Sequence, residues 1–430
     1  MLEKLFKLSH FGTTPKTEIL AGITTYLTMA YIIFVNPAML ADAGMDKGAV
    51  FVATCLAAAI GCFIMGLWAN LPIALAPGMG LNAFFTYGVV LGMGHEWQTA
   101  LGAVFLSGII FLLLSLFKVR EMIINAIPNT LKLAIAAGIG AFLALIALKS
   151  SGIIVAHPAT LVGLGDLTSL SPAMTLIGFF AIIAAVQRNI PGAVMLVVLA
   201  ITVVGLLVGD VSYGGLVSAP PSIAPTFMQM DIAAALDVAM LSVIFAFLFV
   251  DLFDTSGTLI AVTQRAGIAE KDGSVPNLGK ALVADSSATI VGAALGTSST
   301  TSYIESASGV AAGGRTGLTA VTVGVLFVLS MFFAPLAGMI PVYATAGAIL
   351  YVSVLMMFTL KDVKWDDLTE AAPVAVVLLL TPLTFSIAHG ITLGFITYAA
   401  AKALGGKANE VSTSVWIVSA LLLAKIIFIG

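Results

Sequence analysis

The stretch from Gly296 to Arg315, GTSSTTSYIESASGVAAGGR, limits the possible folds of this chain more than any other. Seven of its first eight residues are Gly, Ser or Thr, and its one carboxylate is Glu305. Unpaired backbone groups at membrane depth cost several kcal/mol each, so such a run is tolerated only when buried in protein or lining a water-filled cavity. We expect an extended piece over 297–303 and then a half-helix with Glu305 in its first turn. The alternative is a cytoplasmic loop.

The rest of the chain is apolar enough to define its class. Of the 430 residues, 60% are hydrophobic and 9% are charged, whereas soluble domains carry about 25% charged residues. The mean hydropathy is +1.13. Apolar windows of about 20 residues recur, which predicts an all-α polytopic membrane protein; a barrel would show short alternating segments. Cys55 and Cys62 lie within one apolar span, and we expect both to be core residues.

The apolar windows predict fourteen transmembrane segments. They cover 17–41, 49–69, 71–88, 98–117, 128–148, 171–188, 191–209, 233–264, 278–296, 298–313, 316–336, 341–360, 368–387 and 389–405, with a further apolar stretch at 413–429. The third is broken by ALAPGMG and the tenth by the Ser/Thr run. The predicted parts of the chain are a cytoplasmic N-terminus (1–16), a first seven-span repeat (17–209), an extracytoplasmic connection (210–232), a second seven-span repeat (233–405) and a C-terminal apolar segment (406–430).

The distribution of basic residues supports this topology. With the N-terminus in the cytoplasm, 15 of the 18 Lys and Arg residues fall on the cytoplasmic side. Lys47 and Lys149 fall outside, and Lys425 lies in the last apolar stretch. The connection at 210–232 contains Asp210 and Asp231 and no Lys or Arg, as expected of an external loop.

The two halves of the chain resemble each other. ATCLAAAIG at 53–61 and ADSSATIVG at 284–292 each precede a broken span. The same offset sets Ala76-Pro77-Gly78 opposite Ala307-Ser308-Gly309, and Ile-Pro opens both the fifth and the twelfth span. Because seven spans is an odd number, the two repeats must insert with opposite orientations. Inverted repeats with one broken span each are typical of transporters that bind their substrate near the midplane.

Two carboxylates in the eighth span are the first candidates for ion coupling. A charge at the bilayer centre costs about 2.5–3.5 kcal/mol, so each needs a reason. Asp251, Asp254, Thr255 and Thr258 share one helix face, and one acid of the repelling pair is expected to hold a proton near neutral pH. We assign proton coupling to Asp251, Asp254 and Thr255; the alternative is a structural pair. For Asp285 we expect a packing role, with Ser286 and Ser287 as partners.

The two breaks supply the candidate ligand contacts. Carboxylates accept hydrogen bonds from N–H groups, backbone amides at helix starts hold carbonyls or anions, and aromatic rings stack on flat ligands. The expected substrate-binding residues are Glu305, Asp251, Tyr303, Gly78, Asn82, Phe84, Phe249 and Ser306. A local cap for Asn82 and core packing for the aromatic rings are the alternatives. Walker motifs, metal-ligand spacings and Ser-His-Asp patterns are not found, so we expect no cofactor, no metal and no enzyme activity.

Three motifs carry a family resemblance. FVDLFDTSGT (249–258), YIESASGVAAGGRTG (303–317) and APGMGLNAFF (76–85) resemble the purine permeases of the nucleobase–cation symporter-2 superfamily, and within them the AzgA-like guanine/hypoxanthine/adenine branch. The resemblance implies a core domain of spans 1–4 and 8–11, a gate domain of spans 5–7 and 12–14, and short strands in spans 3 and 10. It also implies that Asp251, Glu305 and Tyr303 are the family's site residues. Relatives for uracil and xanthine carry Glu where Asp251 stands, and some carry His or Asp four residues on, where this chain has Thr255 with Asp254 one residue earlier. The protonation partner therefore stays open.

Together these observations predict a proton-coupled importer of purine bases, of hypoxanthine and guanine first, that works by an elevator-like movement. An adenine permease and an anion exchanger of the same fold are the alternatives; an anion site would need positive charge, and the central acids argue against it. The coupling ion is expected to be H⁺, with Na⁺ as the alternative. The expected partners are a purine base, the lipid bilayer of the plasma (inner) membrane and, as an option, a second copy in a homodimer, but no nucleic acid.

Overall fold

The computed structural model describes residues 2–116, 127–269 and 275–428. The ends of the predicted spans at 117 and 429 therefore lie outside the described residues. The first half of the chain contains α1 (Leu2–Phe6), α2 (Pro15–Met29), α3 (Ile32–Asp42), α4 (Lys47–Ile64), the π-helix η1 (Met65–Ala69), β1 (Leu75–Pro77), α5 (Met79–Ala83), the π-helix η2 (Phe84–Val90), α6 (Leu91–Met93), α7 (Trp97–Leu116), α9 (Asn129–Ser150), β2 (Ile154–His157), β3 (Leu161–Leu164), α10 (Leu170–Gln187) and α11 (Ala193–Leu207).

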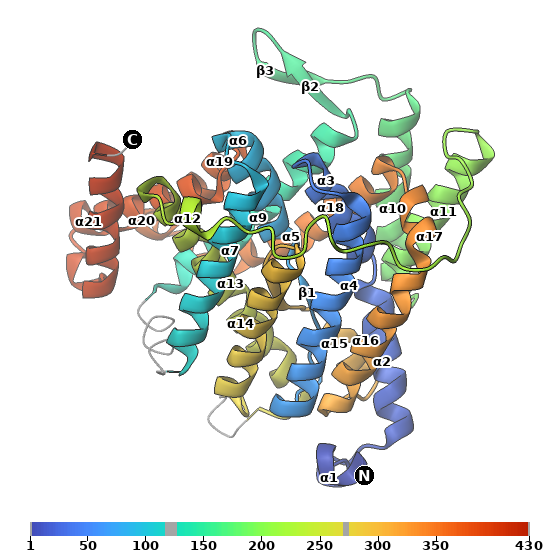
Figure 1. The fold of residues 1–430 in the computed structure, drawn as a ribbon. Helices are drawn as coiled ribbons and strands as arrows, with labels where there is room; N and C mark the ends of the chain where they lie inside the picture. The colour runs from blue at the N-terminus through green and yellow to red at the C-terminus, as the bar shows by residue number, and fades with distance from the viewer. Residues whose placement is uncertain (1, 117–126, 270–274, 429–430) are drawn as a thin grey trace.

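The second half begins after a long connection that runs from α11 across the front of the helices to α12 (Figure 1). It contains α12 (Ile232–Ala235), α13 (Val238–Ala266), α14 (Leu278–Leu295), β4 (Thr300–Ser302), α15 (Ser306–Ala311), α16 (Gly317–Ser330), the 3₁₀ turn η3 (Met331–Phe333), α17 (Ala334–Met339), α18 (Val342–Met357), the 3₁₀ turn η4 (Phe358–Asp362), α19 (Leu368–Leu383), α20 (Ile387–Leu404), the 3₁₀ turn η5 (Ala408–Glu410) and α21 (Thr413–Phe428). The connection is tied down where Met228 N–H donates to the Ala294 carbonyl and Asp231 N–H to the Gln98 carbonyl.

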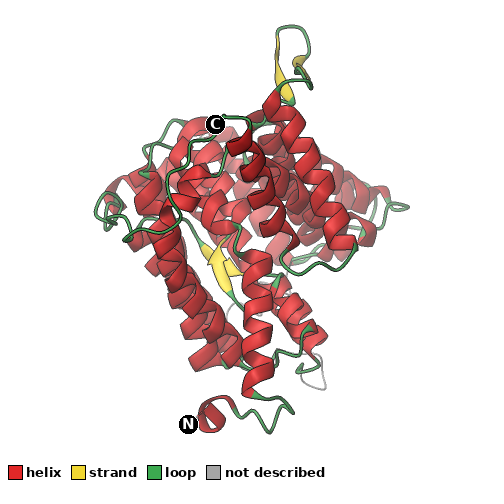
Figure 2. Ribbon diagram, turned by 90° about the vertical axis from the view of Figure 1, so that its right-hand side faces the viewer, coloured by secondary structure: helices red, strands yellow, loops and turns green. Residues whose placement is uncertain are grey.

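The helices confirm a polytopic membrane protein. Among the described residues, ten helical stretches are long and apolar enough to cross a membrane, and four shorter apolar helices accompany them. Each of the fourteen predicted spans coincides with a helix or with a strand followed by a half-helix. The number of actual crossings stays a prediction. A hairpin of β2 and β3, which the sequence did not indicate, projects from the helices at the end opposite the N-terminus (Figure 2).

The two breaks meet in the middle of the molecule, as predicted. β1 and β4 pair antiparallel, with Leu75 opposite Ser302 and Pro77 opposite Thr300, and the pair lies among the helices (Figure 2). The Gly78 N–H donates to the Ser299 carbonyl and the Tyr303 N–H to the Ala74 carbonyl, each at 2.9 Å. These bonds satisfy backbone groups that would be costly to leave unpaired at this depth.

One detail of the predicted repeat alignment is wrong. α14 begins at Leu278, 231 residues after Lys47 of α4, whereas β4 begins at Thr300, only 225 residues after Leu75 of β1. The first half gains its extra residues in η1, which prolongs α4 by a π-helical segment before the chain turns toward β1. Ala307-Ser308-Gly309 therefore lies inside α15, while Ala76-Pro77 lies in strand β1.

Helix packing divides the molecule into two groups. α4 packs against α14 and α16, α7 against α13 and α14, and α2 against α15 and α16. In the other group, α9 packs against α18 and α19, α10 against α11 and α18, and α19 against α20. These groups correspond to the core and gate domains that the family resemblance implies, with β1 and β4 in the core.

Candidate functional site

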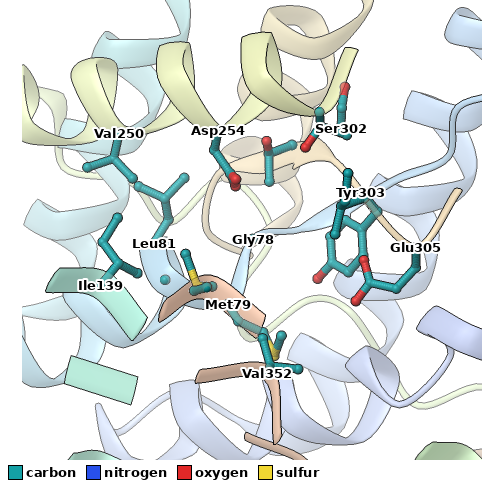
Figure 3. Close-up of a pocket in the computed structure, with 15 residues that line it drawn as sticks. Gly78, Met79, Leu81, Ile139, Val250, Asp254, Ser302, Tyr303, Glu305 and Val352 are labelled. Atoms are coloured by element: carbon teal, nitrogen blue, oxygen red, sulfur yellow. The ribbon is translucent and has the colours of Figure 1, made fainter. Parts of the chain in front are cut away.

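A cavity lies beside the paired strands, where the core group faces the gate group (Figure 3). From the core, its lining comes from the turn between β1 and α5, from α13 and from the residues that link β4 to α15. From the gate, α9 and α18 contribute apolar side chains. The lining residues are Gly78, Met79, Gly80, Leu81, Ile139, Val250, Asp254, Thr258, Thr301, Ser302, Tyr303, Ile304, Glu305, Val352 and Met356. A small, mostly apolar cavity with a few convergent polar groups is the usual form of a small-molecule site.

Glu305 lies between β4 and α15, at the position that precedes the first residue of that half-helix. Its carboxylate oxygen Oε1 accepts a hydrogen bond from the Tyr31 hydroxyl at 2.7 Å. Tyr31 is buried in the turn that separates α2 from α3 and was not among the predicted site residues. Its only signal in the sequence is a single hydroxyl in the apolar run AYIIFV, which does not distinguish it from a core tyrosine.

Tyr303 lines the cavity next to Glu305 (Figure 3). Its hydroxyl donates to the carbonyl of Pro77, the last residue of β1, at 2.5 Å. This bond joins the two breaks and fixes the direction of the ring. A ring held in this way presents a fixed aromatic surface to a flat ligand at small conformational cost.

The structure separates the two acids that the sequence placed on one face of α13. Asp254 lines the cavity with Thr258, and its side chain is exposed there. Asp251 is buried against α14, where the Thr289 hydroxyl lies 3.2 Å from its Oδ2. The Thr289 hydroxyl also contacts the backbone of Thr300 in β4. Asp251 therefore supports the strand from behind, while Asp254 faces the space that a ligand would fill.

Thr255 and Asp285 belong to the same buried layer behind β4. The Thr255 hydroxyl donates to Asp285 Oδ1 at 2.8 Å and lies 2.8 Å from the Thr301 hydroxyl. The Ser302 hydroxyl donates to the same carboxylate oxygen at 3.0 Å. The expected packing role of Asp285 fits this position. Ser286, one of its two predicted partners, instead donates its hydroxyl to the Leu282 carbonyl of its own helix.

Besides Asp251, which is buried behind β4, four more predicted ligand residues lie outside the cavity lining. Asn82 is buried and accepts a hydrogen bond from the Ser298 hydroxyl. Phe84 packs on Phe247 with ring centres 5.0 Å apart, and Phe249 packs on Phe245 at 4.8 Å. Ser306 accepts a hydrogen bond from the Ala74 N–H at 3.0 Å, which ties α15 to the approach of β1. Core packing, the alternative weighed for the aromatic rings, describes Phe84 and Phe249. The local cap weighed for Asn82 does not describe its position, because its partner Ser298 lies in the second break.

Gly78 does line the cavity, but not as a free amide donor. Its N–H is bonded to the Ser299 carbonyl, so the strand pairing uses the group that the sequence analysis offered to a ligand. The absence of a side chain is what this position contributes: a Cβ atom here would lie 2.6 Å from the Thr301 methyl carbon. Within the described part of the chain, no cluster of three or more His, Cys, Asp or Glu side chains could hold a metal ion.

The fold and the cavity define a class of protein. A chamber deep in an apolar helical protein, between two groups of helices and at the meeting point of two broken spans, is the arrangement of a secondary transporter.

The comparisons identify the family within this class. A model described as the permease family matches residues 16–393. The chain is 51% identical over 429 residues to the adenine permease AdeP of Escherichia coli (strain K12), an alignment that covers 100% of this chain and 96% of that protein. It is 45% identical over 422 residues to the guanine/hypoxanthine permease PbuG of Bacillus subtilis (strain 168), covering 95% and 96%. The chain belongs to this permease family and is a transporter, not an enzyme.

A solved structure shares the fold. The transmembrane domain of the cyanobacterial bicarbonate transporter BicA superposes with a TM-score of 0.64 at 16% sequence identity, over 88% of this chain and 97% of that domain. The core and gate arrangement is therefore shared by proteins of very different sequence.

Proposed function

We propose that this protein imports purine nucleobases across the plasma membrane together with protons. The observation that carries the proposal is that two carboxyl groups, Asp254 and Glu305, and the fixed ring of Tyr303 face one cavity between the core and the gate. Such a cavity offers a flat ligand an aromatic surface, apolar walls and hydrogen-bond acceptors. Relatives across the whole chain are adenine and guanine/hypoxanthine permeases, which supports a purine as the ligand.

The hydrogen-bonding pattern of the ligand follows from the carboxyl groups. Hypoxanthine and guanine both carry N1–H next to a C6 carbonyl, and a carboxylate accepts the N1–H. Adenine presents an unprotonated N1 beside its amino group, so it needs a donor and an acceptor, which a protonated carboxyl group provides. We propose hypoxanthine and guanine as the substrates. Adenine is the second candidate, favoured by the 51% identity to an adenine permease.

Proton coupling is proposed for Asp254, the acid of α13 that faces the cavity. Two carboxylates that share a confined apolar space disfavour each other's charge, and uptake of one proton relieves this repulsion. The family resemblance favours Asp251 as the coupling residue. The structure favours Asp254 instead, because Asp251 is buried behind β4 whereas Asp254 lines the cavity. Na⁺ in place of H⁺ remains the alternative for the coupling ion.

The proposed movement is that of an elevator. Core and gate residues both line the cavity, so a displacement of the core along the gate would carry the ligand with β1, β4 and their half-helices. An anion exchanger of the same fold is disfavoured because the cavity holds two acidic side chains and no Lys or Arg among its described lining residues.

Uptake measurements test the proposed function. Cells that lack their own purine permeases and express this protein should accumulate labelled hypoxanthine and guanine, and not uracil or xanthine. Uptake should rise as the external pH falls, collapse with a protonophore and be independent of Na⁺. Uptake of adenine alone would select the second candidate. Transport that depends on Na⁺ and not on pH would overturn the proton assignment, and accumulation of none of these bases would overturn purine transport itself.

A further inference from the structure

We infer that Tyr31 is a positioning residue for Glu305: it holds one carboxylate oxygen as a permanent acceptor and so reserves the other for the ligand. The inference rests on the proposed function, because it assigns the orientation of a group in the proposed purine site. Its basis is the 2.7 Å hydrogen bond from the Tyr31 hydroxyl to Glu305 Oε1. Tyr31 does not line the cavity, so it acts through Glu305.

Close packing of two helices brings Tyr31 to this place. α2 lies directly against α15, because residue 309 is glycine: a Cβ atom there would lie 2.6 Å from the Ala21 carbonyl oxygen and would overlap the Thr25 hydroxyl. The hydroxyls of Thr28 in α2 and Ser308 in α15 lie 2.9 Å apart, and this hydrogen bond fixes how far α2 is shifted along α15. The helix then stops at Met29 and the chain turns, which directs the Tyr31 side chain at Glu305.

The hydroxyl of Tyr31 restricts where a proton on Glu305 can lie. A tyrosine hydroxyl keeps its proton near neutral pH, and a carboxylate oxygen that accepts this hydrogen bond is a poor site for a second proton. Ionised Glu305 therefore offers Oε2 as an acceptor to the ligand. When Glu305 is protonated, the proton is confined to Oε2 and points at the ligand as a donor. Because of Tyr31, the Glu305 Oε2 atom that faces the base is an acceptor when Glu305 is ionised and a donor when Glu305 is protonated.

Among the titratable groups near Glu305, Tyr31 is the one placed to orient its carboxylate. The titratable groups that interact with Glu305 electrostatically are Tyr31, Tyr303, Tyr351 and Asp254. The Tyr303 hydroxyl is already committed to the Pro77 carbonyl. Among the hydrogen bonds of the described residues, the one from Tyr31 is the side-chain bond that reaches the Glu305 carboxylate.

The test uses purified full-length protein and equilibrium binding of hypoxanthine and adenine between pH 5 and 8. The wild type should favour hypoxanthine most at high pH and lose that preference as the pH falls. In Tyr31→Phe, the proton of neutral Glu305 is free to occupy either oxygen. We expect hypoxanthine affinity to fall about tenfold or more and the pH dependence of the hypoxanthine-to-adenine ratio to flatten. Tyr87→Phe is the matched control, because Tyr87 donates a 2.6 Å hydrogen bond to the Asp42 carboxylate and neither residue lines the cavity.

A second variant keeps the inference testable if Tyr31→Phe does not fold. In Glu305→Gln, Tyr31 should hold the amide oxygen and direct the NH₂ group at the ligand, so the variant should prefer adenine, with its unprotonated N1, over hypoxanthine. Preference for hypoxanthine in Glu305→Gln, or a Tyr31→Phe variant that behaves as Tyr87→Phe does, overturns the inference. If the wild type binds neither base, the proposed function has failed instead.

Discussion

The first broken span, 71–93, and the second, 297–311, each supply one strand to the same antiparallel pair, yet their side chains differ completely. Around its strand the first reads LPIALAPGMGLNA, with no ionisable group from residue 71 to residue 83, whereas the second reads TSSTTSYIESASGV from residue 297. β1 and β4 have the same length and are buried throughout. The two halves of the protein thus share a backbone and divide the chemistry between them.

The two broken spans carry different side chains because they face different parts of the protein. The half-helix α5 approaches the gate: a Cβ atom on Gly80 would lie 2.5 Å from a methyl carbon of Ile139 in α9. The missing side chain of Gly80 lets α9 pack directly against this half-helix. The second break faces α13 and α14 with its hydroxyls and the cavity with Glu305. One break therefore shapes the site, and the other supplies its polar groups.

The largest effect should come from the single carboxylate of the second break. Glu305→Gln removes an acceptor for the N1–H of hypoxanthine in a confined site, where a hydrogen bond to a charged group contributes about 1.5–3 kcal/mol. Hypoxanthine binding to the purified variant should weaken about 10- to 100-fold. Asp42→Asn, which neutralises the carboxylate of the Tyr87 pair, is the control and should bind normally. Normal binding in Glu305→Gln would remove Glu305 from the site and end the proposed division of labour.

The next largest effect separates the two acids of α13. Asp254→Asn leaves a neutral side chain in the cavity, so uptake should no longer rise as the external pH falls and should survive a protonophore as downhill exchange. Asp251→Asn keeps an oxygen that can accept from Thr289 and should retain the pH dependence. The measurement is the initial rate of uptake over a series of external pH values. The reverse result would restore the assignment to Asp251 that the family resemblance favours.

These residues also show how far the sequence leads. The Ser/Thr run and the APG turn predict the breaks, because non-helical backbone at membrane depth is tolerated only when it is buried in protein or lines a water-filled cavity. Helical periodicity correctly places Asp251 and Asp254 one turn apart. It does not tell which of two adjacent stripes of α13 faces the cavity, since that depends on how the helix is rotated against α14.

The sequence did not reveal Tyr31 as a site residue for a different reason. Tyr31 lies 274 positions from Glu305 in the sequence, and the bond between them depends on the approach of α2 to α15. The small residues of the sequence GVAAGGR permit that approach, but nothing in them specifies the partner helix. Asn82, Phe84, Phe249 and Ser306 were expected to contact the ligand. In the structure, Asn82 and Ser306 bond to the segments beside the strands, whereas Phe84 and Phe249 pack on other aromatic rings.

A smaller effect is expected from the glycine that seats the second half-helix. Gly309→Ala introduces a Cβ atom 2.6 Å from the Ala21 carbonyl oxygen, and this backbone atom of α2 cannot move aside as a flexible side chain could. Overpacking of this kind costs about 1–3 kcal/mol. The variant should melt at a lower temperature and, because α15 moves away from α2, bind hypoxanthine more weakly. Gly279→Ala is the control in α14, where a Cβ atom meets no described atom within 4 Å. Equal behaviour of the two variants would contradict the close packing of α2 and α15.

The smallest effect on function should come from Ser306, which joins the two breaks without facing the cavity. Its hydroxyl is the acceptor for the buried N–H of Ala74, just before β1. Ser306→Ala leaves that N–H unpaired, at a cost of about 1–3 kcal/mol in stability. The melting temperature should fall while purine affinity stays close to that of the wild type. Ser115→Ala is the matched control, because the buried Ser115 hydroxyl only adds a bond to the Phe111 carbonyl within its own helix. If Ser306→Ala instead weakens binding at unchanged stability, Ser306 contacts the ligand as the sequence predicted, and the second break supplies one more polar group than this structure assigns to it.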